Sequence, residues 1–255
     1  MKRTILTGVL AMAAGLSSLW AQPIAPKVKS QAEAKAIKAI QDAAADPDAV
    51  IKAAEELINK YSDSDFKEFA LTMEAHAYQQ KRDDVNAQLI AERVLEINPK
   101  AYSMQLVLGE VIAPGIKEHD LDRKEKVDKC TKLFTDAIAN AAAAVKPNSQ
   151  ISDADWAGFQ KSNVAEGHNG LGILALLDKN WDVAIKEFQA AVDNDPEQDA
   201  YATRLASSYY SAGKYTEAIA LCDKLLAKPN LNPQIARVVN NIKAQSVRNQ
   251  AATKK

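Results

Sequence analysis

Two consecutive segments of the chain, 165–198 and 199–232, repeat the same residue pattern at a constant spacing of 34. The matched positions are Gly172 with Ala206, Ala184 with Ala218, Leu171 with Leu205, Phe188 with Cys222 and Trp181 with Tyr215. A fixed period of this length indicates stacked helix-turn-helix units. One such unit cannot bury its apolar face alone, so we expect neighbouring units to share a continuous core.

The pattern has a physical explanation in a pair of packed helices. A small residue is needed on each helix where the two cross, and larger side chains fill the space between successive units. Gly213 suits the turn between two helices, where a residue must leave the helical region. Pro196 and Pro229 follow the ends of the second helices, because the residue before a proline is disfavoured in the α conformation.

At these residues the chain resembles the tetratricopeptide repeat (TPR) family. The resemblance implies an all-α fold, a right-handed α-solenoid of TPR-like helix-turn-helix repeats with one irregular, extended repeat and a C-terminal capping helix. The positions expected to pack the repeats together are Ala75, Tyr78, Ala87, Leu171, Gly172, Ala184, Phe188, Leu205, Ala206, Tyr209 and Ala218.

The same register divides the rest of the chain. We expect one solenoid over 30–249, and its parts are a degenerate repeat at about 34–67, a better copy at 68–101, an irregular unit at 102–164, the two regular repeats and a capping helix at 233–249. Residues 250–255 are predicted to be a disordered tail. In the copy at 68–101, Glu74 stands where a leucine is expected and Asp84 where the turn aromatic is expected.

The irregular unit holds 63 residues where one repeat needs 34. Pro114 and Gly115 stop its first helix, a polar loop follows at 116–123, and a long helix is predicted over about 124–145. A further helix at 153–160, capped by Ser152, can run directly into the helix that begins near residue 165. Long insertions in a compact fold are usually functional, so we expect the insertion 114–156 to carry something specific to this protein.

The N-terminal segment 1–21 reads as a cleavable signal peptide. Lys2 and Arg3 precede an apolar run that is shorter than the roughly 20 residues needed to cross a bilayer, and Ala21 ends the segment. The alternative is an uncleaved membrane anchor. Cleavage would leave a short linker at 22–29 and a periplasmic or secreted protein with no transmembrane segment.

Composition and motifs argue against several classes of function. The chain is 47% hydrophobic with a net charge of −1, and it has no basic stripe for nucleic acid. The histidines His76, His119 and His168 do not stand at metal-ligand spacing, and no nucleophile motif occurs. Cys222 takes a repeat core position, so burial is its expected role. We therefore predict no enzyme, cofactor or metal.

The expected function is that of a non-enzymatic scaffold or adaptor in the cell envelope. In TPR proteins the first helices line a concave groove, and the resemblance assigns to it Thr72, His76, Gln79, Glu166, Asn169, Ile173, Leu176, Thr203, Arg204, Ser207 and Tyr210. The occupant would be a peptide or helix of an unidentified partner protein, and a homo-oligomer stays open. The alternative is an accessory module that binds a small ligand or glycan near Trp156, Phe159 and Trp181.

Overall fold

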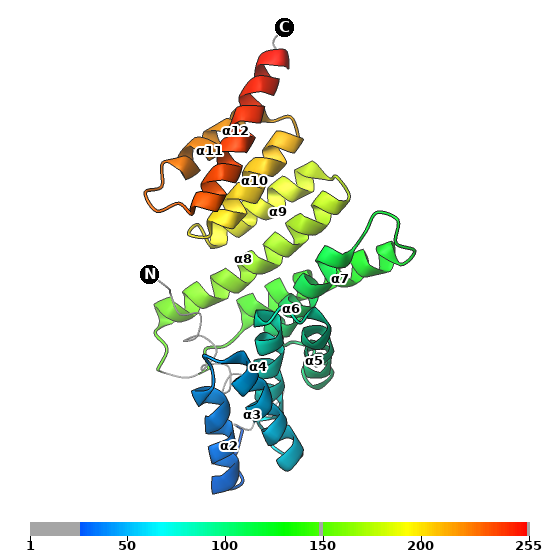
Figure 1. Cartoon of the computed structure of the whole chain (residues 1–255), viewed down its shortest axis with the longest axis vertical. Coiled ribbons are helices and arrows are strands. Elements are labelled where there is room, and N and C mark those ends of the chain that lie inside the picture. The colour runs from blue at the N-terminus through cyan, green and yellow to red at the C-terminus, as the bar shows by residue number, and fades with distance from the viewer. Residues whose placement is uncertain (1–25, 148–149, 254–255) are drawn as a thin grey trace. The chain divides into compact units, whose positions relative to one another are not determined.

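The computed structural model describes residues 26–147 and 150–253, so the predicted leader 1–21 and residues 22–25 lie outside the described residues. The described residues form helices joined by short connections, with no strand among them (Figure 1). The elements are α2 (Gln31–Asp42), α3 (Pro47–Lys60), α4 (Lys67–Gln80), α5 (Asp84–Ile97), α6 (Tyr102–Ile112), the short 3₁₀ turn η2 (Ala113–Gly115), α7 (Arg123–Ala143), α8 (Asp153–Leu177), α9 (Trp181–Asn194), α10 (Asp199–Ser211), α11 (Tyr215–Leu226) and α12 (Pro233–Thr253).

These helices belong to two compact units, whereas the sequence suggested a single solenoid domain over 30–249. Unit 1 contains residues up to 115 together with 139–160, and unit 2 contains 116–138 together with 161–255. The long helices α7 and α8 therefore contribute residues to both units. None of the helices in the described part of the chain is long and apolar enough to cross a membrane.

Unit 1 is built from helices that pack on their neighbours in chain order, from α2 to α6. The Ser30 hydroxyl accepts a hydrogen bond from the backbone N–H of Glu33 and starts α2 as predicted. Asp46 caps α3 in the same way, with Pro47 in the first turn. The apolar faces of α2, α3 and α4 form one core around Ile40 and Leu57, both fully buried.

The end of the insertion completes unit 1. Ser152 caps α8 by accepting a hydrogen bond from the N–H of Asp155 at 3.0 Å. The Gln160 side chain donates to the carbonyls of Ala141 and Ala144 at the C-terminal end of α7. The helix predicted over 153–160 does continue without a break, so α8 runs to Leu177.

Unit 2 repeats the same chain-order packing from α9 to α12. Three glycines of α8 lie where no side chain fits: a Cβ atom on Gly167 would approach Ile138 to 2.5 Å, and one on Gly170 would approach Phe134 to 2.4 Å. A Cβ atom on Gly172 would lie 2.6 Å from the Phe188 ring of α9. The glycines let α8 lie close to α7 and α9.

The C-terminal end differs from the sequence prediction. Residues 250–253 belong to α12, which continues to Thr253 instead of giving way to a disordered tail at Gln250. The Gln250 side chain donates to the Thr216 hydroxyl at 2.8 Å, and Asn249 donates to the Tyr210 hydroxyl at 3.3 Å. These bonds to α10 and α11 support the last turn of the helix. The polar composition of this segment gave no sign of them, so the sequence predicted disorder there.

The turns between paired helices share one backbone feature. Arg82, Lys179 and Gly213 each adopt a positive φ, of 60°, 52° and 74°. Each stands two residues after the last residue of the first helix of a pair, where a left-handed residue commonly ends the helix. Only Gly213 reaches this conformation without a steric cost.

Candidate functional site

A pocket in unit 1 lies at the start of the first helices α4 and α6. Its volume is about 100 Å³. One wall comes from α4 and the turn before it, a second from the turn before α6 and its first residues, and a third from the insertion between α7 and α8. The lining residues are Pro26, Asp65, Phe66, Glu68, Phe69, Thr72, Met73, Asn98, Lys100, Ala101, Tyr102, Ser103, Ala144, Val145, Pro147 and Trp156.

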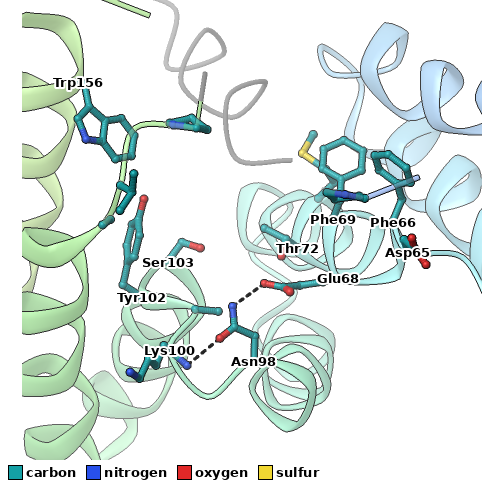
Figure 2. Close-up of a pocket in the computed structure, with 16 residues that line it drawn as sticks. Asp65, Phe66, Glu68, Phe69, Thr72, Asn98, Lys100, Tyr102, Ser103 and Trp156 are labelled. Atoms are coloured by element: carbon teal, nitrogen blue, oxygen red, sulfur yellow. Dashed lines mark hydrogen bonds between the residues drawn. The ribbon is translucent and has the colours of Figure 1, made fainter. Parts of the chain in front are cut away.

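Aromatic rings stand on opposite sides of this pocket. Figure 2 shows Tyr102 and Trp156 on one side and Phe66 and Phe69 on the other. Burial raises the pKa of Tyr102 to about 12, so its hydroxyl stays protonated and can donate a hydrogen bond at neutral pH. Trp156 stacks on Phe159 with ring centroids 5.4 Å apart, which holds the indole on the first turn of α8.

The polar groups of the pocket form a short chain of hydrogen bonds. The backbone N–H of Lys100 donates to Asn98 Oδ1 at 3.0 Å, and Asn98 Nδ2 donates to Glu68 Oε1 at 2.8 Å (Figure 2). Burial raises the pKa of Glu68, and the bond from Asn98 partly opposes that shift. A carboxylate is therefore held in a fixed position among aromatic side chains.

The groove positions predicted on α4 fall into three different environments. Thr72 is buried and lines the pocket. One turn further along, His76 has a buried Nε2 with no hydrogen-bond partner in the described residues, and burial lowers the pKa of its ring. Gln79 donates from Nε2 to Glu110 Oε2 of α6 at 3.0 Å, so these neighbouring first helices are joined by side chains.

In unit 2 the predicted groove positions bond mostly to one another or to the core. Arg204 Nη1 of α10 donates to Asn169 Oδ1 of α8 at 3.0 Å. Ile173 and Leu176 pack against the core around Phe188 instead of standing free.

The remaining groove positions of unit 2 vary in exposure. Thr203 turns its hydroxyl back to the Asp199 carbonyl of its own helix at 2.7 Å. Ser207 is exposed and Glu166 is half-buried. Tyr210 packs against the core that includes Val239 and Ile242 of α12. Their assignment to partner binding stays a prediction.

The aromatic residues that the sequence grouped as a ligand site belong to different units. Trp156 and Phe159 lie together in unit 1, but Trp181 begins α9 in unit 2 and does not line the pocket. The polar loop at 116–123 also belongs to unit 2, where Ile116 is buried and Asp120 accepts hydrogen bonds from Lys117 and Lys126.

Sequence reasoning missed most of the pocket. Glu68 and Asn98 stand 30 positions apart, and Tyr102 and Trp156 are further separated by the insertion. In the sequence, the only hint of this pocket was an acidic residue, Glu68, next to the aromatic Phe69. A pair of this kind is too common to predict a binding site. Thr72 was the single predicted groove residue that lines this pocket.

Several side chains that could take part in chemistry, two cysteines and a histidine, are buried or half-buried. Cys130 and Cys222 carry reduced thiols and are fully buried, and burial raises the pKa of each thiol to about 11, which keeps both protonated. His168 contacts Glu187 through Nδ1 at 2.7 Å. No group of three or more potential metal ligands occurs among residues 26–147 and 150–253.

Comparison with known proteins agrees with this architecture. Residues 133–199 and 169–233 match the tetratricopeptide repeat family model, so the two matches together span 133–233. No curated protein matches the chain by sequence. The fold is similar to that of a thermophilic TPR protein from Thermus thermophilus, with a TM-score of 0.56, 16% identity and coverage of 82% of this chain and 98% of that one.

A second similar structure is the MamA segment from residue 41 to the end, from Desulfovibrio magneticus RS-1. Its TM-score is 0.55 at 15% identity, with 77% of this chain and 98% of that chain covered. At these identities the likeness concerns the fold. The family match over the regular repeats and the chain-order packing of the helices confirm the prediction made from the repeat spacing, and residues 133–233 of the chain are tetratricopeptide repeats.

Proposed function

We propose that this protein is a non-enzymatic scaffold or adaptor that binds an extended peptide or a helix of a partner protein. TPR proteins are generally scaffolds of this kind. The observation that carries the proposal is the unit 1 pocket, where the groove position Thr72 and the inserted residue Trp156 line the same space. The repeat face and the insertion thus supply one site, as a bound chain segment would require.

The size of the pocket favours a peptide over a small ligand. Its volume of about 100 Å³ is below the range of roughly 300–1,000 Å³ that is typical of small-molecule sites. A space of this size accepts one or two side chains of a longer segment, whose backbone would extend over the neighbouring helices. The indole of Trp156 is the feature that supports the second candidate, a small ligand or a glycan ring stacked on it.

The proposed location is the cell envelope, with the protein periplasmic or secreted. The proposal depends on the charged start and short apolar run of segment 1–21. N-terminal sequencing of the protein recovered from the envelope fraction tests it. The expected first residue is Gln22, and a chain that retains Lys2 and Arg3 in that fraction would support the membrane-anchor alternative.

A photo-crosslinking experiment tests the site. A benzophenone amino acid replaces Lys100, which is exposed at the pocket, or Lys52, which is exposed on α3 outside it. Each variant is irradiated in envelope extract. We expect a discrete protein adduct from position 100 and none from position 52, with the adduct lost when Trp156→Ala is added.

The outcomes separate the candidates. Equal adducts at both positions would contradict a pocket-centred site, and the absence of a protein adduct at position 100 would contradict the scaffold proposal. An adduct of two copies of this chain would identify the partner as the protein itself. Circular dichroism of each variant checks that the helices remain.

A further inference from the structure

We propose that the unit 1 pocket selects a partner segment by a lysine or arginine side chain, whose cationic end pairs with Glu68 while its aliphatic stem lies between the aromatic walls. This inference rests on the proposed peptide-binding function and specifies which peptide the pocket takes. It follows from the position of the carboxylate, the walls around it and the charge of unit 1.

The carboxylate of Glu68 lacks a cation. Its side chain accepts a hydrogen bond from the neutral amide of Asn98, and within the described residues no lysine, arginine or histidine forms an ion pair with it. Asp65, at the edge of the same pocket, differs because Lys29 Nζ lies 3.7 Å from its Oδ1. A half-buried carboxylate gains most from a cation that reaches it inside the pocket, where solvent screens the pair less.

The orientation of Glu68 is fixed before any ligand arrives. Asn98 has its Oδ1 held by the Lys100 N–H, so its Nδ2 points to Glu68 Oε1. The bond from Asn98 is made to Oε1. Oε2 accepts no hydrogen bond within the described residues and is not fully buried. Oε2 is therefore available to accept a hydrogen bond from a bound ammonium or guanidinium group.

The walls fit the rest of a cationic side chain. Phe66, Phe69, Tyr102 and Trp156 supply apolar surface on two sides of the pocket (Figure 2). Lysine and arginine bury their methylene stems against such surface while keeping the charged end in a polar position. Aromatic faces also attract a cation directly, most strongly the indole of a tryptophan.

The charge of the whole unit acts in the same direction. Over 26–115 and 139–160 there are 17 acidic and 12 basic side chains, a net charge of −5. An acidic unit attracts a basic segment over the distance of a Debye length and disfavours an acidic one. Lys100 is exposed at the pocket, but its backbone and not its ammonium group belongs to the hydrogen-bond chain.

The first test is selection from a random heptapeptide display library on the full chain. We expect lysine or arginine to be enriched at one position beside aliphatic residues. The enrichment should disappear with Glu68→Gln, which keeps an acceptor for Asn98 but removes the charge. The matched control is Glu96→Gln, an exposed position on α5 outside the pocket, and it should select the same peptides as the unmodified chain.

The second test is a double-mutant cycle with one selected peptide and its norleucine analogue, which has the stem of lysine without the charge. Replacing the lysine should weaken binding to the unmodified chain by about tenfold or more, in line with a charge-assisted hydrogen bond. The same replacement should change binding to the Glu68→Gln variant by less than about twofold. The fluorescence of Trp156 in a Trp20→Phe, Trp181→Phe full chain reports the binding.

The possible failures are distinguishable. Peptides that are selected without any basic preference, with an acidic preference, or with a basic preference that survives Glu68→Gln would overturn the inference and leave the scaffold function standing. Selection of no peptide above the level obtained with Trp156→Ala would overturn both.

Discussion

The two units use the same repeat in different ways. In unit 2 the groove positions of neighbouring first helices bond to each other, as Arg204 does with Asn169. In unit 1 the equivalent helix α4 carries Glu74 and His76, each with a buried polar atom that has no hydrogen-bond partner in the described residues. Among the described residues, the regular repeats 165–232 contain no buried side-chain polar atom without a hydrogen-bond partner, whereas the copy at 68–101 contains two.

This difference indicates that unit 1 contains the functional site. The segments that follow the spacing of 34 residues build a close-packed core, with Gly172 against Phe188. Glu74 departs from the pattern in unit 1, and the end of the insertion, residues 139–156, belongs to the same unit and lines its pocket, whereas residues 116–138 of the insertion belong to unit 2. Sites where local rules fail are commonly functional or strained, and unit 1 fits this expectation.

The largest effect is expected at Glu74, in the core of unit 1. Burial raises its pKa from 4.5 to about 7; Arg93 opposes the shift and Glu55 adds to it. Below pH 4.5 the carboxyl is protonated in both the folded and the unfolded state. As the pH rises through 7 the folded state must ionise it, at a cost of roughly 3 kcal/mol.

Glu74→Gln and Glu74→Leu should therefore raise the free energy of unfolding by about 3 kcal/mol near pH 8 and change it little near pH 4. Urea unfolding at the two pH values measures the difference. Hydrogen exchange near pH 8 should show added protection in α4 and none in α10. Protection that increases equally in both units, or a stabilisation that does not depend on pH, would contradict this account.

The second effect tests the packing of unit 2. Gly172→Ala would place a methyl group against the buried Phe188 ring, and overpacking of this kind should destabilise the chain by about 2 kcal/mol. Gly158→Ala in the same helix α8 is the matched control, because no atom lies within 4 Å of its added Cβ. It should stabilise the helix by about 0.5–1 kcal/mol. Thermal unfolding of both variants measures these changes in stability. An equal change in the two variants would contradict close packing at Gly172.

The smallest effect concerns the turns, where the two units are alike. Lys179 holds φ at 52° in the position that Gly213 takes in the next repeat. Lys179→Gly should stabilise the chain by about 0.5–1 kcal/mol, because glycine adopts this conformation without a clash. Gly213→Ala should destabilise it by a similar amount. A loss of stability in Lys179→Gly, measured in the same thermal assay, would show that its side chain matters more than its backbone.

Part of the candidate site could be predicted from the sequence. Repeat register placed Thr72 on the face that contributes to the pocket, and the unusual length of the insertion directed attention to the segment that contains Trp156. Glu68, Asn98 and Tyr102 were not predicted, because each is an ordinary residue until its neighbours are known. Ile173 and Leu176 were assigned to the groove by register, but they pack against the core around Phe188.

The sequence by itself determined the helices, their turns and their order of stacking. Those features depend on small residues, caps and prolines that recur within one unit, so the period of 34 residues contains them. Tertiary structure decided the continuity of α8, the polar atoms left unpaired at Glu74 and His76, and the pocket. These depend on side chains from segments as distant as 65–73 and 144–156, whose meeting is set by packing and not by any local pattern.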